Sequence, residues 1–383
     1  MKNFEEIKVI GDGGFGIVTK CRDNDTGQIV AIKKMKQKFA TFEECLQLKE
    51  VKSLRKIKHE NVVRLMQVFR ENEYLYLVFE CLGESLLKTL QNRTGPFTDA
   101  EVRYVMHEVL SGLAIVHRQG FFHRDIKPDN LLWAENGKLK IADFGLAREI
   151  RSKPPYTEYV GTRWYRAPEI IIHHPFYNSP VDIWSVGCIA AELYMLKPLF
   201  QGTSENDQLF KILNIMGTPT QQEWPDFNTI VRKRGIRLPQ CSPQDLSTLI
   251  PNASPEAIDF IKQCLTWDPI NRPSANKALQ HRFIQGEKIM PPLSTNVPVQ
   301  KVSTVQTVPS LNDDDINVIP EQSNSPNFFK SRFPDTNPNM FDEVGFRQIQ
   351  NSGKNIYKDP LGKSPRHNQL FNARIGFGSQ SKF

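Results

Sequence analysis

The sequence predicts an α+β fold with two lobes: a five-stranded antiparallel sheet with one helix, then a mainly helical lobe, then a disordered tail. Three observations support this prediction. Strand-like segments separated by turn residues fill the chain up to about residue 80. Apolar residues recur at helical spacing from Thr98 onward, and the composition after Gly286 is rich in Pro, Ser, Asn and Gln. We therefore divide the chain into a first lobe (1–79), a hinge (80–83), a second lobe with a long insert (84–285) and a tail (286–383).

A glycine-rich loop, Gly11-Asp12-Gly13-Gly14-Phe15-Gly16, follows the first strand, which runs from Phe4 to Ile10. Because glycine has no Cβ, such a loop lets backbone approach a phosphate closely. A dinucleotide-binding fold is the competing interpretation, but it requires a helix directly after the glycines and an acidic residue about 20 positions further on. Here a second strand follows, and a turn then leads into a third strand that carries Lys33. This order favours a nucleoside triphosphate site in which Lys33 holds the α- and β-phosphates.

A helix is predicted from Phe42 to Ile57, and Glu50 lies within its apolar stripe, four residues from a leucine on each side. An unpaired buried charge is costly, so this carboxylate needs a partner. Lys33 is the natural one. Glu43 and Glu44 are alternatives, but in the first turn they more simply complement the helix dipole.

Two further strands, Val62 to Phe69 and Tyr74 to Phe79, complete the predicted sheet. Glu80-Cys81-Leu82-Gly83 then forms the hinge, whose backbone is placed to bond an adenine. Within the second lobe the chain is predicted to become helical from Thr98, which forms a capping box with the glutamate three residues later.

Three short motifs in the second lobe indicate phosphoryl transfer. They are His123-Arg124-Asp125-Ile126-Lys127-Pro128-Asp129-Asn130, Asp143-Phe144-Gly145 and Ala167-Pro168-Glu169. Each tripeptide alone occurs by chance, and an Asp beside a Gly is usually a turn. Together, their order and spacing match the protein-kinase signature. In that chemistry the protein mainly positions groups and neutralises charge around Mg²⁺.

Each motif residue then has an expected role. Asp125 is placed to accept the proton of the substrate hydroxyl, and Lys127 to reach the transferring phosphate. Asn130 and Asp143 offer the hard oxygen ligands that Mg²⁺ prefers.

Two other charged groups of the second lobe are assigned to structure and not to chemistry. Asp182 opens an apolar helix and is expected to brace the catalytic loop. Arg272 is the expected ion-pair partner of Glu169.

The second lobe resembles that of the CMGC kinases, which include the cyclin-dependent and mitogen-activated kinases. The matching segments are Leu199-Phe200-Gln201-Gly202-Thr203 and Gly217-Thr218-Pro219, with a long insert before Trp267. Within this group the stretch from Arg148 to Tyr159 is most similar to the RCK subgroup, whose members include the male-germ-cell-associated and intestinal-cell kinases. The resemblance implies ATP and Mg²⁺ as cofactors and Pro-directed phosphorylation of protein serine and threonine. It also implies activation by a cell-cycle-related upstream kinase and a role in cilium or flagellum length and transport.

The kinase resemblance also implies which residues surround ATP. Phe79 occupies the gatekeeper position, and Leu132 the floor of the adenine pocket. The full expected set is Ile10, Gly11, Gly13, Gly14, Gly16, Val18, Ala31, Lys33, Glu50, Phe79, Glu80, Leu82 and Leu132.

Thr157 and Tyr159, in the predicted activation loop, are the expected activating phosphorylation sites. A phosphate orders such a loop only where cations are available to bind it. The residues expected to bind phospho-Thr157 are Lys49, Arg124 and Arg148, and those for phospho-Tyr159 are Arg163 and Arg166.

Composition argues against several other classes of protein. The formal net charge is +7, but the basic residues are spread along the chain without a nucleic-acid-binding motif. Six scattered cysteines without metal spacing fit free thiols in a reducing compartment. No secretory signal or membrane-spanning run is visible. We expect a monomeric, cytoplasmic protein that binds neither nucleic acid nor membrane, with the cilium or flagellum and the nucleus as further locations.

Two alternatives stay open at this point. One is a mitogen-activated kinase, because Thr157-Glu158-Tyr159 replaces the Thr-Asp-Tyr of the best-known RCK members. The other is a catalytically inactive scaffold that acts through its tail, although every expected catalytic residue is present. Lys49 stands where many relatives place an arginine, and a point charge grips phosphate less specifically than a guanidinium. In the tail, Ser325-Pro326 and Ser364-Pro365 fit the expected substrate specificity.

Overall fold

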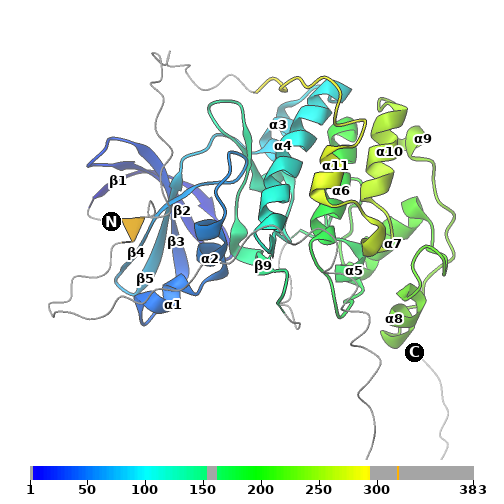
Figure 1. Cartoon of the computed structure of the whole chain (residues 1–383), viewed down its shortest axis with the longest axis horizontal. Coiled ribbons are helices and arrows are strands. Elements are labelled where there is room, and N and C mark those ends of the chain that lie inside the picture. Colours follow the sequence, from blue (N-terminus) through cyan, green and yellow to red (C-terminus); the bar gives the residue numbers. More distant parts are fainter. Residues whose placement is uncertain (1–2, 153–161, 294–316, 319–383) are drawn as a thin grey trace, which may run out of the picture. The chain divides into compact units, whose positions relative to one another are not determined.

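The computed structural model of the chain describes residues 3–152, 162–293 and 317–318. The chain divides into two units, Met1–Gln322 and Ser323–Phe383, and all described residues belong to the first. This unit contains a sheet-rich lobe followed by a helical lobe (Figure 1). The predicted α+β fold is confirmed. The expected phosphorylation sites Thr157 and Tyr159 and nearly all of the tail lie outside the described residues.

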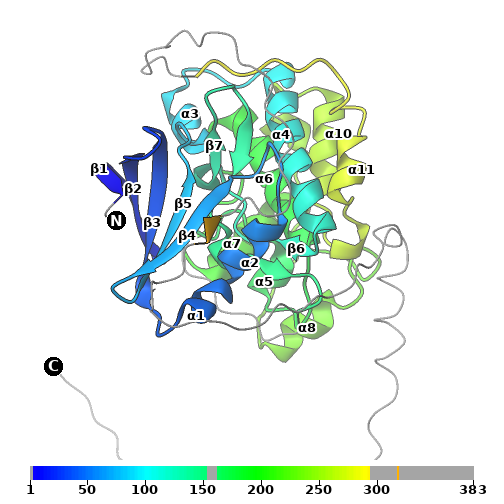
Figure 2. The same cartoon turned by 60° about the vertical axis from the view of Figure 1, so that its left-hand side comes forward.

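The sheet of the first lobe holds five antiparallel strands in the order β1-β2-β3-β5-β4 (Figure 2). Their bounds are β1 Phe4–Asp12, β2 Gly16–Asp23, β3 Ile29–Lys38, β4 Leu65–Glu71 and β5 Tyr74–Glu80. Strand β4 begins three residues later than predicted. The reason is that the preceding Val62 and Val63 pair instead with Ile141 of the helical lobe, where Val63 N donates to Ile141 O at 2.9 Å.

Alternation along β5 explains how the sheet is buried on both faces. Leu75, Leu77 and Phe79 join the main core, whereas Tyr76 and Val78 face a second, smaller apolar cluster. Such alternation follows from successive side chains pointing to opposite faces of a strand.

The prediction of one continuous helix from Phe42 to Ile57 is wrong. The structure has two helices, α1 (Phe42–Leu46) and α2 (Lys49–Lys56), separated by Gln47 and an extended Leu48 with φ −59° and ψ 138°. Both intervening residues are good helix formers, so nothing local predicts the break. The tertiary contacts of α2, which turn Glu50 into the cleft, override propensity here.

The helical lobe is built around α6, most of whose side chains are buried. The capping box predicted at Thr98 is present at the start of α4. The helices of this lobe are α3 (Leu86–Asn92), α4 (Asp99–Arg118), α5 (Pro168–Ile171), α6 (Pro180–Met195), α7 (Glu205–Met216), α8 (Phe227–Lys233), α9 (Leu246–Leu249), α10 (Pro255–Cys264) and α11 (Ala275–Leu279). None of the helices in the described ranges is long and apolar enough to cross a membrane.

Short strands and single 3₁₀ turns carry the motif residues between α4 and α5. Strand β6 pairs with β9, and β7 pairs with β8. The bounds are β6 Phe121–Phe122, β7 Leu131–Trp133, β8 Leu139–Ile141 and β9 Arg148–Glu149, with 3₁₀ turns at Pro128–Asn130 and Phe144–Leu146. A further 3₁₀ turn, Pro269–Asn271, lies between α10 and α11.

The chain after α11 differs from the predicted tail at two places. Residues 286–293 stay on the helical lobe, where Ile289 N donates to Ala100 O at 3.1 Å and Leu293 packs against the core. Further on, β10 (Asn317–Val318) pairs in parallel with Gln67 and Val68 of β4, so that the sheet gains a sixth strand. Composition alone did not indicate these contacts, because each rests on only a few residues.

Candidate active site

Lys33 lies between two carboxylates that come from distant parts of the chain. Its Nζ donates to both carboxylate oxygens of Glu50 at 2.9 Å and to Asp143 Oδ1 at 3.0 Å. Lys33 and Glu50 are buried, whereas the Asp143 side chain is 40% exposed toward the cleft. The predicted Lys33–Glu50 pair is therefore formed, and Asp143 is tied to it.

Protonation states in this cluster follow from its charges. Burial alone would lower the pKa of Lys33, but Glu50 and Asp143 outweigh burial and raise the pKa above its ordinary value. Burial would likewise raise the pKa of Asp143, yet the Lys33 ammonium holds it below its ordinary value. The cluster therefore presents a fixed ammonium beside an ionised carboxylate at neutral pH.

Asp125 is held by the two motif residues that follow it. Lys127 Nζ donates to Asp125 Oδ2 at 2.8 Å, and Asn130 Nδ2 donates to the same oxygen at 3.0 Å and to Asp125 O at 2.8 Å. With its side chain 19% exposed, the carboxylate is oriented but still open to a reactant. These contacts suit a group that accepts a proton from a bound hydroxyl.

Asp182 braces the catalytic loop, as predicted. It accepts hydrogen bonds from the backbone N–H groups of His123 and Arg124, both at 2.8 Å, and lies 2.8 Å from His117 Nε2. Arg124 has a φ of +74° and Asp143 a φ of +60°, conformations that cost non-glycine residues free energy. The buried Asp182 contacts thus stabilise a strained loop at the point where the chemistry is expected.

The predicted ion pair of Arg272 with Glu169 is also formed. The guanidinium makes two hydrogen bonds to the carboxylate, at 2.6 and 2.8 Å, and both side chains are fully buried. This pair joins the loop before α11 to the start of α5 and so supports the segment that follows the activation loop.

The glycine loop has room for a ligand. A Cβ on Gly16 would lie 2.5 Å from Lys34 O, so packing alone requires glycine there. At Gly11, Gly13 and Gly14 a Cβ would meet nothing closer than 3.7 Å. These three glycines are therefore not required by packing, which fits a loop that leaves space for phosphate oxygens.

The expected adenine pocket is assembled from the hinge and the strands beside it. Ala31 of β3 pairs with the gatekeeper Phe79 of β5, and Gly83 N donates to Trp133 O at 2.7 Å, which brings β7 and its Leu132 to the hinge. The N–H of Glu80 donates to Arg64 O, whereas the N–H of Leu82 has no hydrogen-bond partner within the described chain. The apolar residues expected around the adenine are Ile10, Val18, Ala31, Phe79, Leu82 and Leu132.

Two oxygens in the cleft fit Mg²⁺. Asn130 Oδ1 and Asp143 Oδ2 accept no hydrogen bond from any described residue, while the other polar atoms of both side chains are used. Hard oxygen ligands of this kind suit Mg²⁺, which usually retains waters and binds substrate phosphates as well. No group of three or more His, Cys, Asp or Glu side chains able to hold a metal occurs in the described ranges.

A cluster of cations lies beside the catalytic loop. Lys49, the first residue of α2, is close enough to Arg148 and Arg124 that burial and these two charges lower its pKa to about 8. Arg124 also donates to Leu146 O at 3.2 Å and to Tyr177 Oη at 2.8 Å. The three residues expected to bind phospho-Thr157 are thus near one another, although Thr157 itself lies outside the described residues.

The two arginines expected to bind phospho-Tyr159 have other contacts in the structure. Arg163 Nη1 donates to Thr203 O at 3.1 Å, and Arg166 Nη1 lies 3.7 Å from Glu205 Oε1. Glu205 is a partner without a sequence signal, because it lies 39 positions after Arg166 and no motif connects the two. Helix α7 is therefore linked to the loop that precedes Ala167-Pro168-Glu169.

These elements are those of a protein kinase, and the comparison with known families agrees. The protein kinase domain model matches residues 4–284, and the chain belongs to this family. Protein kinases of this family use ATP as the phosphate donor and Mg²⁺ as the cofactor.

The most similar relatives include MAK and ICK, members of the RCK group of CMGC kinases, as the resemblance predicted. The chain is 48% identical over 297 residues to the Homo sapiens serine/threonine-protein kinase MAK, covering 78% of this chain and 48% of MAK. It is 50% identical over 285 residues to the Mus musculus serine/threonine-protein kinase ICK, covering 74% and 45%. It is 47% identical over 292 residues to the Oryza sativa subsp. japonica cyclin-dependent kinase F-4, covering 76% and 63%. The chain spans about half the length of MAK and ICK.

Proposed function

We propose that the chain is an active serine/threonine protein kinase whose substrates carry proline directly after the phosphorylated residue. The observation that supports activity most strongly is the assembled cluster of Lys33, Glu50 and Asp143. A purified chain should transfer labelled phosphate from ATP to a Ser-Pro peptide. Absence of transfer after full activation would favour the alternative of an inactive scaffold.

In the proposed reaction Asp125 accepts the proton of the substrate hydroxyl as that oxygen attacks the terminal phosphorus of ATP, while the bond to the oxygen that bridges the β- and γ-phosphates breaks and ADP leaves. Lys127, 2.8 Å from Asp125, balances the charge that develops beside it. Lys33 orients the α- and β-phosphates, and the glycine loop covers them. Mg²⁺ held by Asn130 and Asp143 would neutralise phosphate charge.

The preference for proline is inferred from the segment Arg163-Trp164-Tyr165-Arg166, which kinases of this group share. A site that cannot accept a hydrogen bond from an ordinary amide after the phosphorylated residue selects proline, which has no N–H. The segment is firmly held, since Trp164 Nε1 donates to Gly202 O and Gln208 Nε2 donates to Trp164 O, both at 3.2 Å. A positional peptide library without enrichment of proline at this position would contradict the proposal.

Activation is proposed to require phosphorylation of Thr157 by an upstream kinase similar to the cell-cycle-related kinase, with Tyr159 as a second, self-phosphorylated site. The support is the cation cluster of Lys49, Arg124 and Arg148, because clustered cations can order a phosphorylated loop. We expect Thr157→Ala to stay at basal peptide-kinase activity after incubation with a cell extract that activates the wild type. Full activation of that variant would exclude Thr157 as the switch.

We also propose, on the resemblance to the RCK subgroup alone, a role in cilium or flagellum length control, with locations in the cytoplasm, cilium and nucleus. The tail is proposed to be regulatory, with Ser325 and Ser364 as sites of self-phosphorylation. A mitogen-activated kinase remains the alternative, and it would be expected to bind short basic-hydrophobic docking peptides. Imaging a tagged chain in a ciliated cell tests the location, and a tagged protein excluded from cilia would contradict it.

A further inference from the structure

Strand β4 lies at one edge of the five-stranded sheet, yet its residues are shielded from solvent. None of its seven residues is exposed, whereas most residues of β1, at the opposite edge, are exposed. An edge strand presents unpaired N–H and C=O groups to which a further strand can add. The two edges of the sheet therefore differ, and the β4 edge is the one that takes an additional strand.

The additional strand comes from the chain's own C-terminal part. In β10, Asn317 pairs with Gln67 and Val318 with Val68, in the parallel direction (Figure 2). Strands β10 and β4 belong to the same unit of the chain. A parallel pair needs a long connection, and here the connection includes the whole helical lobe. The pairing thus attaches a segment that follows the helical lobe to the first lobe.

The sequence around β10 suits an added strand. Ile316, Val318 and Ile319 are β-branched, and such residues favour strands. Pro320 follows directly, and because it has no N–H to donate it can end the pairing. Three consecutive aspartates, Asp313-Asp314-Asp315, precede these residues, and no other run of three acidic residues occurs after residue 293. The segment therefore combines an acidic block with a short strand-forming stretch.

The first lobe has an excess of positive charge directly before β4. Arg55 and Lys56, in the last turn of α2, and Arg64, the residue before β4, are exposed and form no ion pair with a described carboxylate. Cations in a last helical turn complement the helix dipole, but this explanation does not apply to Arg64. The one carboxylate between residues 51 and 64, Glu60, lies 3.5 Å from Lys138 of the helical lobe. An acidic segment would complement this stretch.

The parallel direction is the one that suits these charges. Residues that precede β10 approach β4 from its N-terminal end, where Arg64 lies. Continued by two residues, the same register would set Asp315 opposite Leu65. An antiparallel strand would instead direct the aspartates toward Glu71 and Glu73, at the other end of β4. Charge and strand direction therefore agree.

Strand β4 also contacts the helix that carries Glu50. Leu65 of β4 and Leu54 of α2 belong to the same buried core. Arg70 Nε, near the end of β4, donates to Phe39 O, shortly before α1, at 2.9 Å. A segment that stabilises β4 is therefore expected to stabilise α2 and the ion pair of Glu50.

We propose that segment 313–319 is an internal ligand of the first lobe, which adds to β4 as a parallel strand while its aspartates bind the cations before β4. The docked segment holds α2 where Glu50 meets Lys33. This effect on activity rests on the proposed function, whereas the docking itself does not. The chain's own segment is favoured over that of a second copy, because a tether gives it an effective concentration on the order of millimolar.

Hydrogen exchange of the full chain tests the docking without catalysis. The double variant Asn317→Pro, Val318→Pro removes both paired amides, so that whichever of them faces β4 is lost. Amides of β4 should exchange about tenfold faster in this variant than in the wild type, while those of β1 stay unchanged. The matched control Val305→Pro, Gln306→Pro alters the chain outside the segment and should exchange like the wild type.

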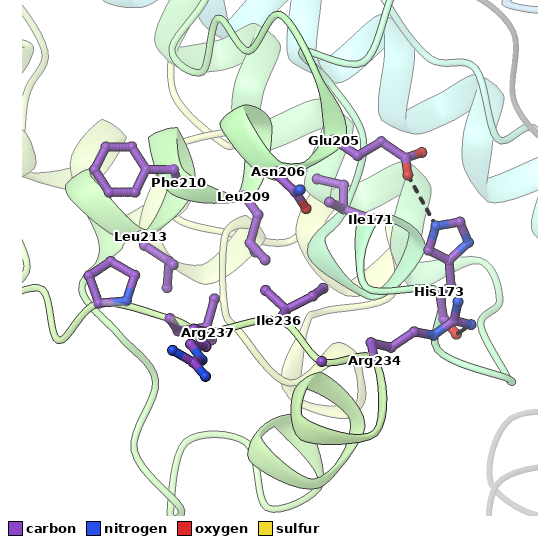
Figure 3. A pocket seen from close by; sticks show the side chains of 13 residues that line it. Ile171, His173, Glu205, Asn206, Leu209, Phe210, Leu213, Arg234, Ile236 and Arg237 are labelled. Atoms are coloured by element: carbon purple, nitrogen blue, oxygen red, sulfur yellow. Dashed lines mark hydrogen bonds and ion pairs between the residues drawn. The ribbon is translucent and has the colours of Figure 1, made fainter. Parts of the chain in front are cut away.

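A fluorescein-labelled peptide of residues 309–322 measures the site directly by anisotropy. It should bind the Asn317→Pro, Val318→Pro chain about tenfold more tightly than the wild type, whose own segment competes. This affinity should fall as salt rises, and about fivefold when Arg64→Glu is added to the same chain. Arg237→Glu, which reverses an exposed arginine of the helical lobe (Figure 3), is the matched control and should leave the affinity unchanged.

Phosphate transfer to a short Ser-Pro peptide tests the support of α2. The Asn317→Pro, Val318→Pro variant should have a kcat about threefold lower than the wild type, and a saturating amount of the 309–322 peptide should restore it. Restoration by the added peptide distinguishes lost docking from misfolding. The exchange and anisotropy measurements do not depend on catalysis, so a failure of the proposed kinase activity would leave them intact.

Several results would overturn the proposal. They are unchanged exchange of β4 in the Asn317→Pro, Val318→Pro variant, peptide binding that is equal in this variant and the wild type, and binding that Arg64→Glu and Arg237→Glu weaken equally. A kcat that the double variant does not lower, or that the peptide does not restore, would remove the support of α2. A dimer in sedimentation that the double variant dissociates would show docking on a second copy instead.

Discussion

The phosphate site and the cation cluster each contain a lysine, Lys33 and Lys49, but the charges that surround these two lysines have opposite signs. Lys33 contacts two carboxylates, and its pKa is raised. Lys49 lies near two arginines, forms no ion pair with any described carboxylate, and its pKa is lowered to about 8. In the first region, which we call the balanced region, carboxylates compensate the ammonium of Lys33. In the second, two guanidinium groups lower the pKa of Lys49, and an anion placed nearby would raise it again.

This difference distinguishes a site that is already assembled for ATP from a site that would act only after phosphorylation. The Lys33 cluster is oriented for ATP in the chain as it stands, so its residues belong to the chemistry. The Lys49 cluster fits a phosphate that another kinase adds, so its residues belong to regulation. Substitutions in one region should therefore leave the other region intact.

The largest effect is expected in the balanced region. Lys33→Arg should lower kcat on the order of 10²-fold or more, because the larger guanidinium cannot occupy the ammonium position between Glu50 and Asp143. Asp125→Asn should give a loss of the same order by removing the proton acceptor. The measurement is steady-state phosphate transfer by purified protein.

Two controls accompany these variants. Lys36→Arg changes an exposed lysine of the same strand and should keep wild-type turnover. Thermal unfolding of Asp125→Asn should match that of the wild type, since its side chain is partly exposed. Wild-type turnover in Asp125→Asn would remove that residue from the proposed mechanism.

Motif spacing made the balanced region predictable from the sequence. The order of Lys33, Glu50, Asp125 and Asp143 follows a known pattern, and an inward-facing carboxylate requires a partner. The helix break at Leu48 was not predictable, because its cause is tertiary and its residues favour helix.

Contacts between distant segments outside any motif were also missed. Glu205 links α7 to Arg166, and β10 extends the sheet from the predicted tail. Neither has a local signature, because single ion pairs and two-residue strands leave no periodicity to detect.

Two buried carboxylates on α6, Glu192 and Asp182, extend this comparison, because Glu192 has fewer hydrogen-bond partners than Asp182. It is buried, its Oε2 has no hydrogen-bond partner in the described chain, and burial raises its pKa to about 7 despite a hydrogen bond with Tyr165. Asp182 on the same helix is also buried, and burial would raise its pKa too. There, hydrogen bonds with His117 and the backbone of His123 reverse the effect and lower the pKa.

The sign of the resulting pH dependence can be worked out. Between about pH 4.5 and pH 7 the unfolded chain has ionised Glu192 while the folded chain keeps it protonated, so the free energy of unfolding falls as pH rises through this window. The free energy of unfolding of Glu192→Gln should therefore exceed that of the wild type by about 1 to 3 kcal/mol at pH 8, and the two should be about equal at pH 4.5. Urea denaturation at several pH values measures this. The exposed Glu135→Gln is the control, and parallel curves for wild type and Glu192→Gln would contradict the raised pKa.

The smallest effect is expected at Lys49. Because its pKa in the unmodified chain is about 8, raising the pH from 7 to 9 should remove much of its charge, whereas an arginine stays charged. A phosphate on Thr157 would raise the pKa of Lys49 again by adding negative charge nearby. Lys49→Arg should thus raise the activity of the Thr157-phosphorylated protein only about twofold at pH 7, since two arginines already contribute, and somewhat more at pH 9. Activity of both phosphorylated proteins across this range, with lysine side-chain NMR of the unmodified chain, checks the prediction. A Lys49 that titrates near 10.5 before phosphorylation, or identical pH profiles for the two proteins, would place the phosphate elsewhere and leave the cation cluster without a role in activation.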